Sequence, residues 1–149
     1  MRAVIQRVSS ARVVIDDHLT GEIGSGVLLL LGVHKEDTDN DITWLADKAV
    51  NLRIFEDSQG KMNLSLLDTG GSMLIVSQFT LLGDCRKGRR PSWSVAAPPD
   101  RAKHLYEQFI QEVQKRNVPC ATGRFQAMME VSLVNSGPVT MLIDSHKKF

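Results

Sequence analysis

The longest apolar run of the chain is Val27-Leu28-Leu29-Leu30-Leu31-Gly32-Val33, and glycines at positions 21, 24 and 26 lead into it. The run has no alternating polar residues that would mark a solvent-facing side, so it predicts a strand that is buried on both faces. A strand of this kind lies in the interior of a sheet. We therefore expect it to be the central strand, with the other elements arranged around it.

Helical periodicity predicts two main helices. Residues 38–52 begin with acidic side chains, which suit a helix N-terminus, and a second helix is expected to begin at Pro98-Pro99-Asp100. The second helix should end near Asn117, because Pro119 disfavours a helical conformation at the residue before it. The apolar stripes are Ile42, Leu45, Ala46 and Ala49 in the first helix, and Ala102, Leu105, Tyr106, Phe109, Ile110 and Val113 in the second.

The remaining apolar runs predict further strands, separated by turn residues. Turns are expected at Asp57–Gly60, between short extended pieces, and at Asp68–Gly71. The expected strands are a hairpin formed by Arg2–Val8 and Ala11–Ile15, a core strand with a polar interruption at Ser72–Leu82, and two strands at Phe125–Val134 and Val139–Asp144 joined through Ser136-Gly137-Pro138.

This order of elements predicts the fold class. We expect a single α+β domain over residues 1–149, with mixed, partly barrel-like β-sheet layers and the two main helices packed on one side.

The composition, 42% hydrophobic and 23% charged over 149 residues, is typical of one ordinary soluble domain. No apolar stretch approaches the roughly 20 residues of a membrane-spanning helix. Cys85 and Cys120 lack C-x-x-C spacing, which favours a reduced, cytosolic interior.

Two segments place neutral hydrogen-bonding residues inside strand-like runs: Ser77-Gln78-Phe79-Thr80 and Asn135-Ser136-Gly137-Pro138-Val139-Thr140. In the first, Ser77 and Thr80 either bond to neighbouring main chain while Phe79 fills the core, or they face a substrate. In the second, a tight turn would place Pro138 at its third position, which favours a cis bond; the alternative is a trans proline that blocks edge pairing. Both segments are candidate sites in which backbone geometry matters more than charge.

No side-chain catalytic machinery is visible in the sequence. The four histidines, His18, His34, His104 and His146, are scattered, and we expect each to be a solvated surface residue. The sequence has no serine, histidine and aspartate pattern and no nucleophile elbow. The histidines and cysteines form no metal-ligand cluster either, and the carboxylates of the first helix are explained by its dipole.

A basic cluster follows the first segment at Arg86-Lys87-Gly88-Arg89-Arg90, with Trp93 next to it. Arginine side chains match phosphate oxygens, so the cluster is a candidate contact for a polyanion; a plain solvated loop is the alternative. The net charge of the chain is only +1, which argues against broad nonspecific binding of nucleic acid. Any such contact would therefore be local.

Taken together, the two segments, the amino-terminal Met1-Arg2-Ala3-Val4-Ile5-Gln6-Arg7-Val8 and the stretch Gly123–Glu130 resemble the D-aminoacyl-tRNA deacylases, also called D-tyrosyl-tRNA deacylases. The resemblance covers the whole chain, and both segments occur in the order and separation found in that family. It implies a cytoplasmic homodimer without cofactor or metal. Its active sites would lie at the dimer interface, and its partners would be tRNAs charged with a D-amino acid or glycine.

The resemblance also implies a mechanism. The ester that joins the D-amino acid to tRNA would be hydrolysed with help from the terminal 2′-hydroxyl of the RNA, and Gly137–Pro138 in cis would reject L-aminoacyl groups. The residues assigned by the resemblance are Ser77, Gln78, Phe79 and Thr80 for catalysis, and Arg7, Ala102, Phe125, Met129, Asn135, Gly137 and Pro138 for substrate binding. The charge of the basic cluster makes Arg86, Lys87, Arg89 and Arg90 the candidate contacts for the tRNA backbone. Two alternative functions remain: an esterase with Thr80 as nucleophile, and a noncatalytic RNA-binding module.

Overall fold

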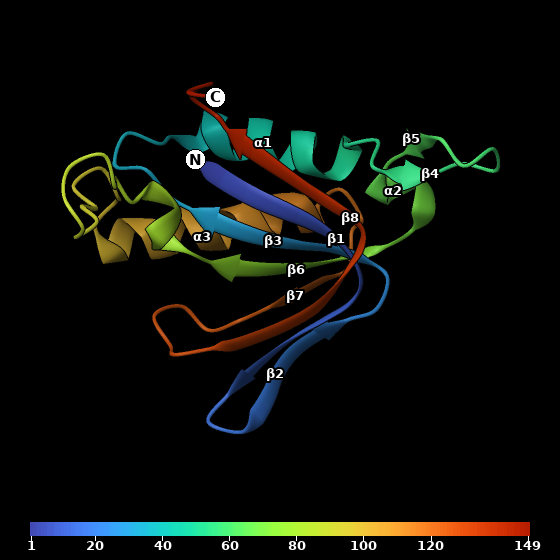
Figure 1. Cartoon of the computed structure of the whole chain (residues 1–149), viewed down its shortest axis with the longest axis horizontal. Coiled ribbons are helices and arrows are strands. Elements are labelled where there is room, and N and C mark those ends of the chain that lie inside the picture. Colours follow the sequence, from blue (N-terminus) through green and yellow to red (C-terminus); the bar gives the residue numbers. More distant parts are fainter.

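The computed structural model describes residues 1–149, and a six-stranded mixed sheet organises them (Figure 1). The strands of this sheet are β1 (Arg2–Ile15), β2 (His18–Ile23), β3 (Gly26–Gly32), β6 (Ser72–Ser77), β7 (Cys120–Thr122) and β8 (Glu130–Asp144). The other elements are the ribbon of β4 (Phe55–Glu56) and β5 (Met62–Leu64), the helices α1 (Asp39–Asn51), α2 (Leu66–Thr69) and α3 (Pro99–Gln114), and the 3₁₀ turn η1 (Phe79–Leu82).

Strand β3 is the central strand, as the apolar run predicts. It pairs antiparallel with β1 and parallel with β6, and the strand order is β2-β1-β3-β6-β7. Six of its seven residues are buried, because helices cover one face and the curled sheet covers much of the other. On the far side of β1, β8 pairs with almost the whole length of that strand.

The two main helices pack on the same face of the sheet, as expected. Their apolar stripes join alternate residues of β1, β3 and β6 in one buried cluster, which includes Ile5, Leu29, Ile75, Leu45 and Phe109. Alternate residues of a strand point to opposite faces, so one set of side chains from each strand supplies this cluster. The helix prediction is therefore confirmed, while the four-residue helix α2 occupies a place where only a break was expected.

The sheet curls on its other face into a partly closed barrel. There a second buried cluster forms from Leu28, Leu74 and Val76 together with the second half of β1. Strands β2 and β7 approach closely, since a Cβ added at Gly21 would lie 2.6 Å from the Thr122 carbonyl oxygen. In Figure 1, β1 and β8 run from the helix-covered part of the sheet into this curled part. The barrel-like expectation is confirmed.

Two strand predictions are wrong in the same way. Residues Arg2–Ile15 form one long strand rather than a hairpin, and residues Glu130–Asp144 form one strand rather than two strands joined by a turn. The polar and glycine-proline interruptions produce irregularities in the β1–β8 ladder, not chain reversals. Each strand continues through its irregularity because the other strand pairs with it on both sides.

The prediction of a core strand at Ser72–Leu82 is confirmed for its first half and wrong for its second half. Strand β6 ends at Ser77, and the chain then bends into η1. Phe125 precedes β8 and lies in a turn instead of a strand. The short strand β7, which pairs parallel with β6, was not expected. No helix of the protein combines the length and the apolar character needed to cross a membrane.

Candidate functional site

The first segment, Ser77–Thr80, lies where β6 leaves the sheet. Ser77 still pairs with Leu31 of β3, and the backbone N–H of Gln78 donates to the Leu31 carbonyl at 2.7 Å. The following residues turn out of the sheet in η1. The segment is thus anchored to the central strand on one side and open on the other.

Phe79 does not fill the core. Its side chain is 55% exposed, and its ring lies 5.6 Å from the ring of Trp93 in a tilted arrangement. This finding removes the interpretation in which the segment is only a core strand with satisfied hydroxyl groups. An exposed aromatic pair beside an open backbone segment is a surface that a ligand can contact.

The hydrogen-bonding groups of the segment are largely free. The side-chain amide of Gln78 donates to Oγ1 of Thr80, while no bond is found for the Ser77 hydroxyl. No histidine or carboxylate contacts Thr80, so this hydroxyl has no general base. The backbone N–H groups of Phe79 and Thr80 begin the 3₁₀ turn, where no earlier carbonyl of the turn can accept from them. Two backbone donors of an exposed turn therefore have no partner within the chain.

The expected pocket walls lie near this edge of β6. Tyr106 donates its hydroxyl to the Ile75 carbonyl at 2.9 Å, and its ring centroid lies 6.1 Å from that of Phe125. Ala102 is one helical turn from Tyr106 on α3. Ala102 and Phe125 pack on the helix-side cluster, whereas Met129 packs on the second cluster. All three predicted wall residues are partly buried.

The second segment, Asn135–Thr140, forms a large bulge in β8. Gln6 pairs with Thr140 and Val8 pairs with Asn135, so Arg7 alone stands opposite residues 136–139. The peptide bond between Gly137 and Pro138 is cis, as expected, although it lies in a bulge and not in a hairpin turn. Gly137 has a φ of +131°, a conformation that a residue with a side chain rarely adopts.

Arg7 holds this bulge from the helix side of the sheet. Its side chain is almost fully buried, with Nε donating to the Ser136 carbonyl at 2.9 Å and Nη1 to the Ile54 carbonyl at 2.7 Å. Its Nη2 lies 3.8 Å from a carboxylate oxygen of Glu56. A Cβ at Gly137 would lie 2.9 Å from Nη2 of Arg7, so the guanidinium also leaves no room for a side chain there.

Asn135 was predicted to bind substrate, but its side chain bonds within the chain. Its Oδ1 accepts from the Val139 N–H at 3.0 Å, and its Nδ2 donates to Oε1 of Gln6 at 2.8 Å and to Oγ1 of Thr140 at 3.2 Å. These bonds occupy both ends of the amide. Asn135 therefore shapes the bulge.

Within one chain the two segments are far apart. Ser77 aligns with Leu31 and hence with Ala3 of β1, whereas the bulge lies opposite Arg7. Four residues of strand span roughly 13 Å, and the steps from β6 through β3 and β1 to β8 add roughly 14 Å. The segments are thus about 20 Å apart, and one chain cannot bring both to the same small ligand.

The basic cluster lies on an exposed loop directly after η1, closed by a bridge between Asp84 and Ser92. Arg86 forms a bidentate pair with Asp84, and its hydrogen bonds hold the pKa of that carboxyl below its usual range. Lys87, Arg89 and Arg90 have no carboxylate partner in the chain. Three of the four predicted cations are therefore free to contact an anion.

Two histidines are not the scattered surface residues that the sequence predicts. The rings of His34 and His146 lie 5.1 Å apart, and Nε2 of His146 is 3.1 Å from Oδ1 of Asp37. Burial lowers the pKa of His34. Asp37, Asp41 and His146 have the donor types of a metal site, but the buried N-terminal ammonium group of Met1 already donates to Asp37. We therefore interpret the cluster as a structural ion-pair network.

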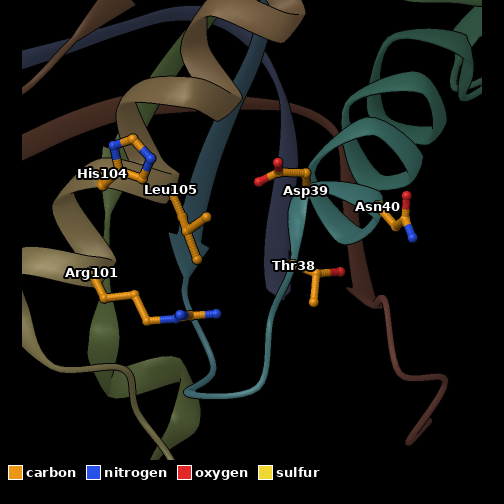
Figure 2. A pocket seen from close by; sticks show the side chains of 6 residues that line it. All are labelled: Thr38, Asp39, Asn40, Arg101, His104 and Leu105. Carbon is orange, nitrogen blue, oxygen red and sulfur yellow. The ribbon is translucent and has the colours of Figure 1, made fainter.

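A cavity of about 440 Å³ lies between the start of α1 and the first turns of α3 (Figure 2). Arg101 and His104 extend toward it from α3, and Thr38 and Asn40 border it from the start of α1. Arg101 donates to the Asp37 carbonyl at 2.6 Å, so part of its guanidinium already holds the loop before α1. None of the residues of the two segments lines this cavity.

Some residues that hold the two segments in place could not be identified from the sequence, because their partners depend on how the strands and helices pair in the folded chain. Gln6 bonds to Asn135, Tyr106 bonds to the Ile75 carbonyl, and the Ile54 carbonyl accepts from Arg7. For Gln6 and Tyr106 the only signal in the sequence is a polar atom on an otherwise apolar strand or stripe, and the Ile54 carbonyl has no signal at all. Pairing across the sheet is needed to show what each polar atom contacts.

Comparison with known proteins shows the family to which the chain is similar. The family model described as D-Tyr-tRNA(Tyr) deacylase matches residues 4–144. The chain is 60% identical over 149 residues to the D-aminoacyl-tRNA deacylase of Thermosipho africanus and 55% identical over 149 residues to that of Clostridioides difficile. Each alignment covers 100% of both chains.

Solved structures share the fold. The c-Myc DNA Unwinding Element Binding Protein has a TM-score of 0.91 and 36% identity, over 97% of this chain and 98% of that one. A chain from the structural analysis of "a probable eukaryotic D-amino acid tRNA deacylase" has a TM-score of 0.83 at 19% identity, over 95% and 97% of the two chains, which shows the fold alone. By the extent of the family match and the identity of its relatives, the chain belongs to the D-Tyr-tRNA(Tyr) deacylase family.

Proposed function

We propose that the protein hydrolyses the ester bond of D-aminoacyl-tRNA, and of glycyl-tRNA, to release the free amino acid and tRNA. The observation that carries this proposal is the exposed turn at Phe79 and Thr80, with two free backbone donors and no base near the Thr80 hydroxyl. The named activity of full-length relatives at 60% and 55% identity supports it.

The two backbone N–H groups are suited to bind the aminoacyl carbonyl. Donors fixed by a folded backbone stabilise negative charge on a carbonyl oxygen without reorganising during the reaction. An aminoacyl ester is already activated, so orientation and such donors supply much of what its hydrolysis requires. The free hydroxyl of Ser77 and the amide of Gln78 orient the substrate in this scheme.

The missing base is supplied by the substrate in this proposal. Thr80 accepts a hydrogen bond from the Gln78 amide, which is a donor and cannot remove a proton from the hydroxyl. The 2′-hydroxyl of the terminal adenosine lies next to the ester in any aminoacyl-tRNA and assists the attack of water. Ala102 and Phe125, at the edge of β6, are the proposed walls for the aminoacyl-adenosine end, with Met129 at the margin.

Selection for D-aminoacyl groups is assigned to Gly137–Pro138. In this scheme the two carbonyl groups of the step occupy the position that an L side chain would need, so L-aminoacyl groups are rejected by exclusion. A D side chain points away from the step, and glycine has no side chain to exclude. Glycyl-tRNA is therefore a substrate in the proposal.

The distance of about 20 Å between the segments favours a homodimer with active sites at its interface. The face of the sheet opposite the helices carries an apolar row in register, Leu142, Val4 and Leu30, and Leu142 is 62% exposed. A second copy covering this row would bury it and carry its own bulge toward the first segment of its partner. Such an isologous contact is the usual form of a homodimer.

The basic loop is the proposed contact for the RNA backbone. It follows η1 directly, so Lys87, Arg89 and Arg90 flank the site where the ester would lie. Arg86 contributes less, because Asp84 already pairs with it. A substrate of this kind is found where translation takes place, and we place the protein in the cytoplasm on that ground.

The decisive experiment compares matched substrates. Purified protein is mixed with the same tRNA charged with the D- or the L-form of one amino acid, and loss of the ester is followed over time. We expect rapid cleavage of the D-form only, and slow cleavage of a D-aminoacyl-tRNA that ends in a 2′-deoxyadenosine. Binding of both forms without loss of ester would support the RNA-binding module instead.

A further inference from the structure

The bulge in β8 has lost part of the ladder that holds ordinary strands together. Residues 136–139 stand opposite a single residue of β1, so their backbone groups cannot pair in register. Side chains replace the missing partners at both ends of the bulge. Arg7 donates to the Ser136 carbonyl, and Asn135 Oδ1 accepts from the Val139 N–H.

The bond at the Val139 end depends on how the Asn135 amide is oriented. Only the amide oxygen can accept from the Val139 N–H, and only the amide nitrogen can donate to Oε1 of Gln6 and Oγ1 of Thr140. Gln6 lies 2.8 Å from Nδ2, closer than Thr140 at 3.2 Å. The Val139 N–H can only donate, so it fixes the oxygen end of the Asn135 amide, and Oε1 of Gln6 holds the nitrogen end on the other side.

Gln6 and Arg7 are neighbours on β1 and point to opposite faces of the sheet, as successive strand residues do. Arg7 is buried with the helix side, next to the Ile54 carbonyl, whereas Gln6 lies on the face that carries the apolar row. The bulge is thus fixed from both faces by adjacent residues. Arg7 sets its amino-terminal end and Gln6, through Asn135, sets its carboxyl-terminal end.

We propose that Gln6 is a positioning residue for discrimination between D- and L-aminoacyl groups, acting through Asn135 on the Gly137–Pro138 step. This inference rests on the proposed function of that step. Without the Asn135 bond, the carboxyl-terminal end of the bulge keeps the packing of the buried Val139 and the pairing of Thr140, but it loses the hydrogen bond at the Val139 N–H. The Gly137–Pro138 step between the two ends can then shift. Exclusion of an L side chain requires the carbonyl groups to stay in place, so a shift of this kind admits L-aminoacyl groups.

The test compares Gln6→Leu, which has no acceptor, with Gln6→Glu, which keeps an acceptor oxygen at the same reach. For each protein, kcat/KM is measured on the same tRNA charged with the D- or the L-amino acid. We expect Gln6→Leu to lower the D-to-L ratio about ten-fold, the scale of one hydrogen bond, through faster cleavage of the L-form. Gln6→Glu should keep the ratio within about two-fold of the wild type. Ser10→Ala, at an exposed position of the same strand, is the matched control and should match the wild type.

A second measurement does not depend on whether Gln6→Leu folds. In the wild-type protein the side-chain NH₂ protons of Asn135 should exchange slowly with water in NMR spectra, and Gln6→Glu should preserve this protection. Rapid exchange in the wild type would overturn the inference, as would an unchanged D-to-L ratio in folded Gln6→Leu. If the wild type itself cleaves both forms equally, the proposed function fails instead, and the NMR result still decides whether Gln6 orients Asn135.

Discussion

At the scale of single residues, the buried guanidinium of Arg7 bridges two backbone carbonyls from different parts of the chain, those of Ser136 and Ile54. We predict that Arg7→Met lowers the free energy of unfolding by about 2–4 kcal/mol, because both carbonyls lose a charged donor in a buried place. Urea denaturation measures the change. Arg12→Met, at an exposed position of the same strand, is the control and should change stability by less than about 0.5 kcal/mol.

Thr80 separates the proposed mechanism from the nucleophile rival. We predict that Thr80→Val lowers kcat on D-aminoacyl-tRNA by less than about ten-fold, because the hydroxyl supplies one hydrogen bond and no covalent bond. Loss of a true nucleophile lowers kcat by about 10⁶-fold in well-studied hydrolases. Single-turnover kinetics distinguish these outcomes, and a trapped ester between the amino acid and the wild-type protein would contradict the prediction.

The site was only partly predictable at this scale. The motif residues could be found because neutral polar groups interrupt apolar strands at Ser77–Thr80 and Asn135–Thr140. The structural role of Asn135 could not, because its partners Gln6 and Thr140 are defined by a register that the bulge shifts. The contact between His34 and His146 was missed because the carboxyl-terminal residues meet the loop after β3 only in the folded chain.

At the scale of elements, the start of α1 predicts a pH dependence. Burial opposes ionisation of Asp41, but hydrogen bonds from Ser145 and Thr38 outweigh it and lower its pKa from 3.8 to about 2. A lowered pKa stabilises the folded state above the unfolded value, and this contribution disappears as the pH falls from about 4 to about 2. We predict that Asp41→Asn loses about 1 kcal/mol at pH 7 and that the difference from wild type shrinks toward pH 2. Urea denaturation at several pH values measures this difference, and a difference that stays constant with pH would contradict the prediction.

The basic loop predicts the salt dependence of tRNA binding. Each cation that contacts a phosphate releases counterions, so log Kd depends on log salt concentration with a slope set by the number of contacts. We predict that Lys87→Gln, Arg89→Gln and Arg90→Gln each weaken binding and reduce that slope by roughly 0.7–0.9. Fluorescence titrations over a salt series measure it. Lys61→Gln, in the exposed turn before β5, should leave the slope unchanged, and an unchanged slope in all three loop variants would remove the loop from the RNA contact.

The main helices and the central strand could be predicted from the sequence because the apolar patterns that indicate them lie within single elements. The stripes of α1 and α3 and the run of β3 depend on residues within one element. The long strands β1 and β8 could not be predicted, because Ser9-Ser10 and Gly137-Pro138 have the composition of turns. Pairing between two strands at opposite ends of the chain carries each strand through its irregularity, and such pairing leaves no local pattern.

At the scale of the whole molecule, the position of the two segments decides what one copy of the chain can do alone. The first segment leaves the sheet at the Ser77 end of β6, and the bulge lies beside Arg7 on the far side of β1. Both segments belong to one site only if a second copy supplies one of them. The apolar row beside the bulge, of which Leu142 is exposed and Val4 and Leu30 are half-buried, is the surface that such a copy would cover.

We predict that Leu142→Lys converts a homodimer into monomers, because the charged group would be buried against the row of Val4 and Leu30 in the dimer. Leu142 is 62% exposed in the single chain, so the substitution leaves the monomer folded. Leu19→Lys, at a 57% exposed leucine on β2, is the control and should remain dimeric. Sedimentation velocity gives the association state, and cleavage of D-aminoacyl-tRNA should fall with the dimer fraction. A Leu142→Lys protein that stays dimeric would show that another surface joins the two copies, and a monomer with full, D-selective activity would show that one chain brings both segments to the substrate by another route.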